Sequence, residues 1–484
     1  MLESTRAILP ELILVFTTFY ITVRSASGRA ARDSLFIEAL TGAAIALAVL
    51  LFYSNQYMNF KGFYDMILLD KTAYFFRALF IALGIFVIIM TKNSVEISDY
   101  LFGEFLVVTL SITAGTCFLA SSIDLLMVYL SLEWISLSSY LLTGFIARKR
   151  IAGEAAMKYV LFGGIASAVM LFGISWLFGI TGSLRLADIA GAFVDSQQGA
   201  MMFALVLILV GFAFKISAVP LHFWAPDVYQ AAPTPATTLF SIGPKAAGFA
   251  ILIRMFYYSM FKDNAGAMES IRPDIETILC VMAAITMTAG NLLALRQENI
   301  KRLLAYSSIS HAGFLLMGVA ALSDRGIEAL LFYLFAYLLM NGGAFFVVNF
   351  IINKWNSENI SDYEGLAWRG GSHAYLAVTL SVFLFSLAGL PPFAGFIGKW
   401  YIFAAAVEKK LYWLVIVALI NIVIALYYYA RIVKAMYLVQ DISKKESFKI
   451  PFNETFWMGS LGFLTIYFGI FFSPFFVYLE SILR

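Results

Sequence analysis

Long apolar runs separated by short polar loops dominate the pattern along this chain of 484 residues. A run of about 20 apolar residues is long enough to cross the hydrocarbon layer of a bilayer as a helix. The runs are centred near residues 15, 45, 82, 110, 135, 167, 210, 248, 285, 312, 340, 390, 424 and 468. The pattern therefore predicts an all-α polytopic membrane protein with about 14 transmembrane helices.

Proline interrupts some of these runs and predicts discontinuous helices. Pro220 lies in the seventh run, Pro244 in the eighth, and the pair Pro391 and Pro392 in the twelfth. Proline lacks an N–H and its ring clashes with the carbonyl of the preceding turn, so we expect a helix break at each position. Irregular backbone at membrane depth persists only against protein or a water-filled cavity. The breaks therefore predict hydrated pockets inside the bundle.

The spacing of these features indicates an internal repeat. Pro220 and Pro391 lie about 170 residues apart, and a similar interval separates Glu133 from His311. We expect two five-helix units, spans 4 to 8 and spans 9 to 13, inverted relative to each other because five is odd. The predicted division is a three-helix segment at 1–95, five-helix units at 96–262 and 263–440, and a C-terminal helix at 441–484.

Composition agrees with a membrane protein and excludes several functions. Hydrophobic residues make up 61% of the chain and charged residues only 13%, whereas a soluble domain carries about 25% charge. The net charge of +3 is too small to indicate a nucleic-acid partner. The two cysteines lie inside apolar runs, and no glycine-rich nucleotide loop or cysteine cluster occurs. We expect no metal, no cofactor and no redox chemistry in this chain.

Loop charge gives an expected orientation. Most lysines and arginines outside the runs fall in odd-numbered loops, so the positive-inside rule predicts both termini on the non-cytoplasmic side. The first run has no small-residue cleavage site after it, and we expect it to be retained as a span.

Glu133 is a candidate because it lies in the middle of the fifth run. A charge at the centre of a membrane helix costs about 2.5–3.5 kcal/mol on insertion scales. Tyr129, Ser136 and Tyr140 share its helix face, and a polar stripe of this kind points into a bundle. We interpret Glu133 as a proton-binding or charge-pairing group. The alternative is a carboxyl group neutralised in a helix–helix contact.

Three lysines, Lys215, Lys245 and Lys399, also lie inside runs, each within about seven residues of a proline. Burial disfavours the charged form of a lysine and a nearby carboxylate restores it, so movement of a partner could switch proton binding to release. The proline pair at 391–392 frees the carbonyls of Leu387 and Ala388. For Lys215, the alternative is a snorkelling side chain beside a structural kink.

Further polar residues lie inside the runs or beside them. His311 has Ser307 one turn before it, and we weigh a functional role against a satisfied core histidine. Another set forms one face of the eleventh span, either lining a water path or joining helices: Tyr333, Tyr337 and Asn341. Glu104 and Glu154 are secondary candidates for proton relays, and Glu154 is alternatively a surface ion-pair partner. His222 and Asp227 would cap or orient the broken segment.

Four motifs together resemble a known family. They are KISAVPLHFWAPDVYQAAPTPATTLFSIGPKAA, SLEWISLSSYLL, ENIKRLLAYSSISHAGFLLMG and SLAGLPPFAGFIGKWYIF. They resemble the antiporter-like membrane subunits of respiratory complex I, the NADH:quinone oxidoreductase, and within these the N type. The resemblance runs from about residue 100 to 440.

The resemblance implies a proton-translocating subunit with a polar axis through the membrane middle. Its Glu–Lys pair falls on Glu133 and Lys215, its central lysine on Lys245 and its distal lysine on Lys399; His311 matches the histidine between the last two. NADH, flavin, iron–sulfur centres and quinone would belong to partner subunits. The expected neighbours are an M-type and a small K-type subunit, and the expected location is the bacterial inner membrane.

Three other classes remain open at this point. The first is a subunit of a multi-subunit sodium/proton antiporter, which resembles these chains closely. The second is a structural spacer in the membrane arm, and the third a counterpart in membrane-bound hydrogenases or photosynthetic NDH-type complexes.

Overall fold

The computed structural model describes residues 2–28, 31–53, 56–146, 150–192, 198–262, 270–439 and 449–483. Some expectations fall outside these ranges. They concern part of the loop charge behind the predicted orientation (Arg29, Arg148, Lys149 and the lysines of 440–448) and the expected boundaries between 262 and 263 and between 440 and 441. The orientation and the four-part division therefore stay predictions.

The described residues contain 13 helices long and apolar enough to cross a membrane, or 14 when the pair bent by 78° at its break is counted. The expectation of an all-α bundle with about 14 spans is confirmed. The spans are α2 (Leu9–Ala26), α3 (Arg32–Tyr53), α4 (Lys71–Thr91), α5 (Phe102–Ser121), α6 (Leu125–Thr143), α7 (Arg150–Thr181), α9 (Gln198–Ile216), α11 (Thr234–Leu252), α12 (Arg272–Ala294), α13 (Ile300–Ala320), α14 (Asp324–Trp355), α15 (Gly371–Ala388), α17 (Tyr412–Leu438) and the bent pair α18 (Phe452–Ile470) with α19 (Ser473–Leu483).

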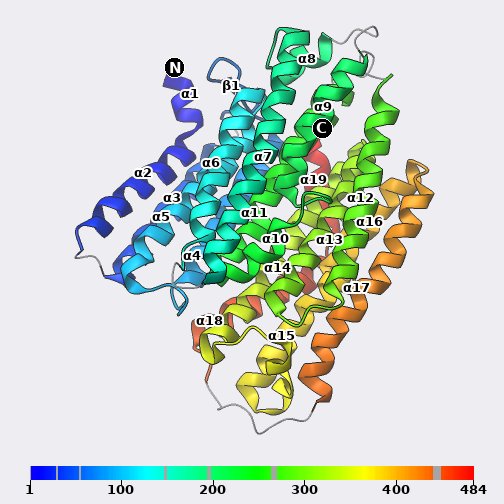
Figure 1. Ribbon diagram of the computed structural model, residues 1–484. Coiled ribbons are helices and arrows are strands. Elements are labelled where there is room, and N and C mark those ends of the chain that lie inside the picture. The colour runs from blue at the N-terminus through cyan, green and yellow to red at the C-terminus, as the bar shows by residue number, and fades with distance from the viewer. Residues whose placement is uncertain are drawn as a thin grey trace. The chain divides into compact units, whose positions relative to one another are not determined.

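Shorter elements join the spans or continue a broken one. They are α1 (Leu2–Ala7), α8 (Leu186–Gly191), α10 (Trp224–Ala231), α16 (Ala394–Glu408), a π-helical continuation of α11 (Ile253–Lys262), and a hairpin of β1 (Phe60–Gly62) with β2 (Ile67–Leu69). The hairpin strands are antiparallel, with Phe60 opposite Leu69. Figure 1 labels most of these elements along the chain.

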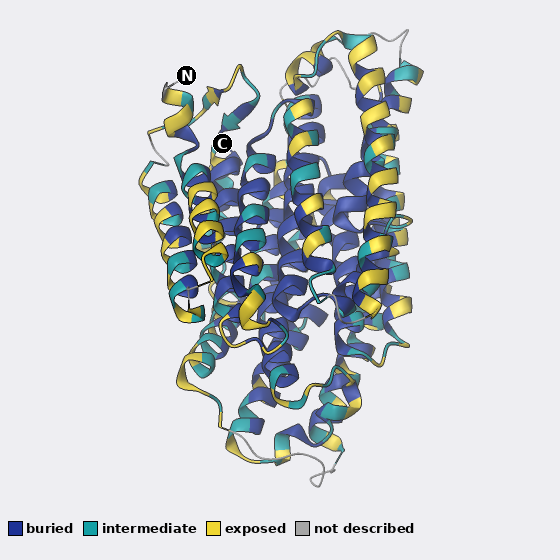
Figure 2. Cartoon of the chain, turned by 60° about the vertical axis from the view of Figure 1, so that its left-hand side comes forward, coloured by how far each residue is buried: buried dark blue, intermediate teal, exposed yellow. Residues whose placement is uncertain are grey.

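The chain divides into two compact units, residues 1–278 and 279–482. In the first unit α11 is buried at every position and packs against α4, α5 and α9. A helix that is apolar all round is the one placed in a bundle interior. By contrast, α7 exposes large apolar side chains such as Leu161, Ile165 and Phe172, which suits contact with lipid. Figure 2 shows that exposed residues follow some helices along their length, whereas other helices are almost entirely buried.

In the second unit α13 and α14 take the interior place. In their most apolar stretches, 94% of the residues of α13 and 89% of those of α14 are buried, against 33% for α17. The 32 residues of α14 pack against α13, α15, α16 and α18. The unit's polar side chains on these inner helices are therefore held away from lipid.

Two predicted helix breaks are present. Helix α9 ends at Ile216, Ser217 takes a left-handed conformation with φ 61°, and α10 begins at Trp224. Helix α15 ends at Ala388, Gly389 has φ 88°, and α16 begins at Ala394. Each break contains a cis peptide bond, before Pro220 and before Pro392. The seventh and twelfth spans are discontinuous, as the prolines indicate.

The break expected at Pro244 is wrong. Pro244 lies inside α11, which continues on both sides of it. A membrane helix tolerates an internal proline when surrounding protein stabilises the freed backbone, and α11 is enclosed by its neighbours along its whole length. Lys245 therefore projects from an unbroken helix.

The order of elements is alike in the two series of five spans. The third member of each is a 32-residue helix, α7 or α14, and the fourth is the broken span. This order is what an internal repeat requires. The inverted relation between the two series stays a prediction.

Candidate functional site

Lys215 is buried at the end of α9, with 2% of its surface exposed. Its Nζ donates a hydrogen bond of 3.0 Å to Ser136 Oγ on α6. Glu133, one turn before Ser136, accepts a hydrogen bond from Ser167 Oγ on α7. Within the described part of the chain no direct ion pair joins Glu133 to Lys215, so a neutral hydroxyl occupies the place expected for the carboxylate.

The broken segment fixes the end of α9 beside Lys215. Trp224, the first residue of α10, donates from Nε1 to the carbonyl oxygen of Phe214 at 3.1 Å. The Trp224 ring stacks on Tyr159 of α7, with centroids 4.2 Å apart and planes 7° apart. The carbonyl oxygen of Phe214, next to Lys215, thus accepts from the Trp224 side chain and from the backbone N–H of Ser217.

Lys245 lies in the same unit on the buried helix α11 and is 1% exposed. Gly248, one turn further on, marks where α11 meets α9. A Cβ built on Gly248 would lie 3.7 Å from the Cβ of Lys215 and closer still to the side chain of Ile216. The helices that carry the two lysines therefore pack directly against each other.

Lys399 lies in the second unit, in the second half of the broken twelfth span, and is 2% exposed. Its Nζ donates to the carbonyl oxygens of Leu387 at 2.9 Å and Ala388 at 3.0 Å. These are the carbonyls that the proline pair frees. The ammonium also lies 4.9 Å from the ring centroid of Phe314 on α13.

His311 is the centre of a buried hydrogen-bonded group in the same unit. Its Nδ1 lies 2.6 Å from the hydroxyl of Tyr333 on α14, and its Nε2 lies 3.2 Å from the hydroxyl of Tyr429 on α17. The Tyr429 hydroxyl also bonds to Ser307 Oγ. A neutral imidazole donates from one nitrogen and accepts at the other, so the two phenols bond to it in opposite senses.

The predicted polar face of α14 lies inside the protein. Tyr333, Tyr337 and Asn341 are all fully buried. The rings of His311 and Tyr337 are 5.3 Å apart. Phe314, which contacts Lys399, follows His311 by one turn on α13, so this helix carries His311 and also contacts the lysine of α16.

The secondary candidates do not join either group. Glu104 is exposed and accepts a hydrogen bond of 3.2 Å from Ser25. Glu154 is exposed as well and pairs at 2.8 Å with Lys158, which suits the surface ion pair expected as its alternative role. His222 is buried in the broken segment beside the ring of Phe223.

Lys158 also pairs at 2.8 Å with Asp227. Since Asp227 lies on α10 and Lys158 on α7, this ion pair ties the short helix of the break to its neighbour. Asp227 therefore orients the broken segment, one of the two roles considered for it.

Sequence reasoning missed Tyr429 and three ion pairs. Tyr429 lies in an apolar run that gives no sign of the distant histidine. Arg77 on α4 pairs with Glu11 on α2, and Arg254 pairs with Asp70. Lys301 is fully buried and lies 3.5 Å from Glu358. Arg77 could have been recognised from the sequence as a candidate, because it lies inside an apolar run.

No group of three or more His, Cys, Asp or Glu that could hold a metal ion occurs in the described residues. Both cysteines are buried, and neither forms a disulfide within the described residues. The titratable groups described above are instead lysines, phenols, His311 and Glu133, side chains that can donate or accept protons.

A polytopic bundle with two broken spans and a buried lysine beside each break has the architecture of a membrane ion carrier. The family model described as NADH:quinone oxidoreductase/Mrp antiporter, TM, matches residues 122–425. The chain belongs to this family.

Individual relatives agree with this assignment. The chain is 39% identical to an NADH-quinone oxidoreductase subunit N of Anaeromyxobacter sp. over an alignment of 500 residues. The alignment covers 98% of this chain and 96% of that relative. It is 40% identical to the subunit N of Chlorobium chlorochromatii over 92% of this chain and 88% of that one. A chain of respiratory complex I from Thermus thermophilus has 30% identity and a TM-score of 0.79, covering 95% of this chain and 97% of that chain.

Proposed function

We propose that this chain is a proton-translocating membrane-arm subunit of an NADH:quinone oxidoreductase. Relatives that carry the name of subunit N of this enzyme match nearly the full chain, which supports the proposal. The carrying observation is the Lys399 ammonium, buried and held by two carbonyls of a broken helix. The chain itself performs no redox step; electron transfer from NADH to quinone takes place in partner subunits.

In the first unit the working element is the hydrogen bond from Lys215 to Ser136. Glu133 lies one turn from Ser136 on the same helix, so a shift of α6 or of the Lys215 side chain brings carboxylate and ammonium together. Pairing favours the protonated lysine, and separation favours its release. Lys215 then passes its proton toward Lys245, whose helix packs against Lys215 at Gly248.

In the second unit the histidine group and Lys399 form the next part of the path. Exchange of the His311 tautomer moves a proton from the side of one phenol to the side of the other. Lys399 receives the proton while the two carbonyls stabilise the charged form. The order Glu133, Lys215, Lys245, His311, Lys399 is the one that the family resemblance implies.

The partners follow from the same proposal. M-type and K-type membrane subunits are the expected neighbours, and the bacterial inner membrane is the expected location, with both termini on the non-cytoplasmic side. NADH, flavin, iron–sulfur centres and quinone belong to other chains of the complex.

The test is Lys215→Ala in the assembled complex, in inverted membrane vesicles. We expect NADH-driven proton pumping to fall strongly, while NADH oxidation by an artificial acceptor, which reports assembly, stays normal. Lys409→Ala is the matched control, since this lysine is exposed. Unchanged pumping by a fully assembled Lys215→Ala complex would overturn the proposal.

The family description also includes Mrp antiporters, which supports a second candidate function. An antiporter subunit would purify without flavin and iron–sulfur chains and would exchange sodium for protons without NADH. Purification in mild detergent with identification of the companion chains separates the two candidates.

A further inference from the structure

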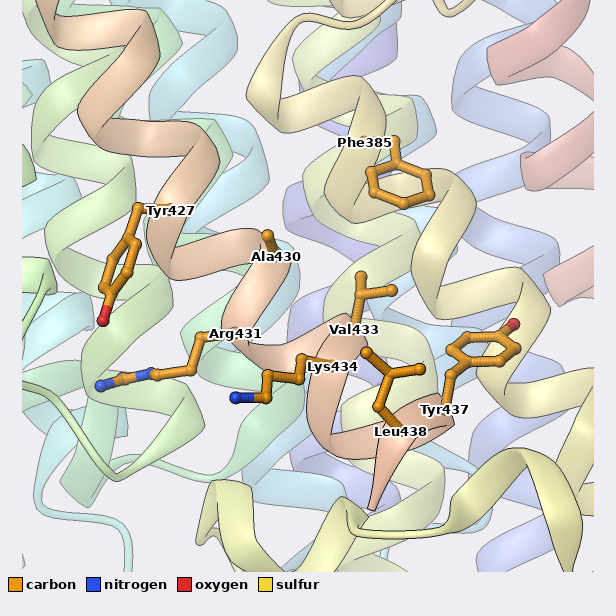
Figure 3. Close-up of a pocket in the computed structure, with 8 residues that line it drawn as sticks. All are labelled: Phe385, Tyr427, Ala430, Arg431, Val433, Lys434, Tyr437 and Leu438. Carbon is orange, nitrogen blue, oxygen red and sulfur yellow. The ribbon is translucent and has the colours of Figure 1, made fainter. Parts of the chain in front are cut away.

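A cavity of about 630 Å³ lies in the second unit, and neither Lys399 nor a residue of the histidine group is among those that line it. Figure 3 shows the side chains that line it, seven of them from the last four turns of α17 and one from α15. They are Phe385, Tyr427, Ala430, Arg431, Val433, Lys434, Tyr437 and Leu438. We call this cavity the α17 groove.

One side of the α17 groove is cationic. Arg431 and Lys434 are one turn apart on α17, and Figure 3 shows their side chains extending to the same side. Arg431 donates from Nη1 to the carbonyl oxygen of Leu295 at 2.9 Å and from Nη2 to that of Gln297. These are neutral acceptors, and none of the eight lining residues is acidic. The charge on this side is therefore not neutralised by a carboxylate within the groove.

The other side is apolar. Phe385 projects from α15 toward Val433 on α17, and the 74% exposed Leu438 continues the surface (Figure 3). The groove thus joins a cationic region to an oily wall, a combination that fits an amphiphile with a negative head.

Its position is that of a lipid head group. The groove lies at the C-terminal end of a membrane span, where Trp368, itself 58% exposed, donates to the carbonyl oxygen of Tyr437 at 2.7 Å. Tryptophan and tyrosine gather at the level of the head groups. Basic pockets between membrane helices at that level bind anionic lipid head groups.

We propose that the α17 groove binds an anionic phospholipid. Its phosphate lies at Lys434 and the guanidinium of Arg431, and an acyl chain lies along Phe385, Val433 and Leu438. Inorganic phosphate would share the charge contacts but leave the apolar wall uncovered. The site is independent of the proton path and of the proposed function.

The experiment uses the full chain in its purified, partly delipidated complex, with a phosphatidylglycerol that carries a photoreactive group in its acyl chain. We expect the probe to label the peptide 427–438. Unlabelled phosphatidylglycerol should reduce this labelling by competition, and phosphatidylcholine should reduce it much less. Lys434→Gln removes an exposed charge without disturbing a buried contact, and labelling should fall about fivefold, with a larger loss when Arg431→Gln is added.

Lys409→Gln is the matched control, because it removes an exposed lysine just before the other end of α17. Labelling there should stay at the level of the unaltered chain. Equal competition by phosphatidylcholine, or displacement of the probe by inorganic phosphate alone, would overturn the lipid assignment. So would absence of labelling in the assembled complex, which would mean that another chain covers the groove.

Discussion

The Nζ of Lys215 lies 3.0 Å from Ser136 Oγ, and Ser136 itself donates to the carbonyl oxygen of Leu132 at 2.7 Å. The hydroxyl proton is thus used within α6, and Ser136 acts toward the lysine purely as an acceptor. Glu133 is meanwhile bonded to Ser167. The lysine and the carboxylate each have a neutral partner, and this arrangement is the separated state of the charge pair that the proposed function requires.

Ser136→Ala tests this arrangement. Loss of a hydrogen bond to a charged group is worth about 1.5–3 kcal/mol, so Lys215 should move toward Glu133 and proton pumping should fall several-fold. Ser139→Ala is the control, because Ser139 is also buried on α6 and donates to the carbonyl oxygen of Ile135. Equal pumping by the two variants would show that Ser136 has no special part.

Gly389→Ala tests the position of Lys399. Gly389 has φ 88°, and a Cβ there would lie 2.9 Å from Cδ and 3.2 Å from Nζ of Lys399. We expect loss of pumping through displacement of the ammonium from its two carbonyls, in addition to about 1–2 kcal/mol of backbone strain.

Gly182→Ala separates the two effects of that change. Gly182 also has a left-handed backbone, with φ 70°, but nothing lies within 4 Å of its Cβ position. It should lose similar stability, measured by thermal unfolding of the complex, and keep its pumping rate. A parallel loss of pumping in both variants would contradict a specific effect on Lys399.

Tyr333→Phe and Tyr429→Phe test the histidine group. Each removes one of the two hydroxyls bonded to the His311 ring, at 2.6 Å and 3.2 Å respectively. We expect both to slow pumping, and Tyr333→Phe to slow it more because its bond is shorter. Tyr428→Phe is the control, since Tyr428 is buried next to Tyr429 but donates to Asn291 at 3.0 Å. Slowing of the same size in all three variants would indicate a packing effect alone.

The two real helix breaks could be predicted because proline acts on its own backbone. The consequence of Pro391 and Pro392 for the carbonyls of Leu387 and Ala388 is equally local, and Lys399 bonds to those carbonyls. Pro244 shows the limit of this reasoning. Whether a helix survives a proline depends on what encloses it, and α11 is buried at every position.

The partners of the predicted site residues could not be read in the same way. Tyr429 and His311 are more than a hundred residues apart in the sequence, and only the packing of α13 against α17 brings them together. Ser136 was recognised as part of the Glu133 face, but its place between the two charges depends on the approach of α9. The effect of a residue on its own backbone can be predicted from the sequence, whereas contacts between spans depend on how the helices pack.

The pair Glu11 and Arg77 gives the last prediction, on stability. Arg77 Nε and Nη2 each donate at 2.6 Å to the Glu11 carboxylate, with both residues about 98% buried or more. Removing one partner of a buried ion pair leaves an uncompensated charge and costs about 3–5 kcal/mol, whereas replacing both by apolar residues is often neutral. We therefore expect Arg77→Met to reduce the amount of assembled complex in membranes sharply, and Glu11→Leu combined with Arg77→Met to restore it.

Asp99→Asn is the control. It removes the 83% exposed partner of Arg32 and should cost under about 1 kcal/mol. Failure of the double variant to recover would mean that the pair has a role beyond holding α2 against α4.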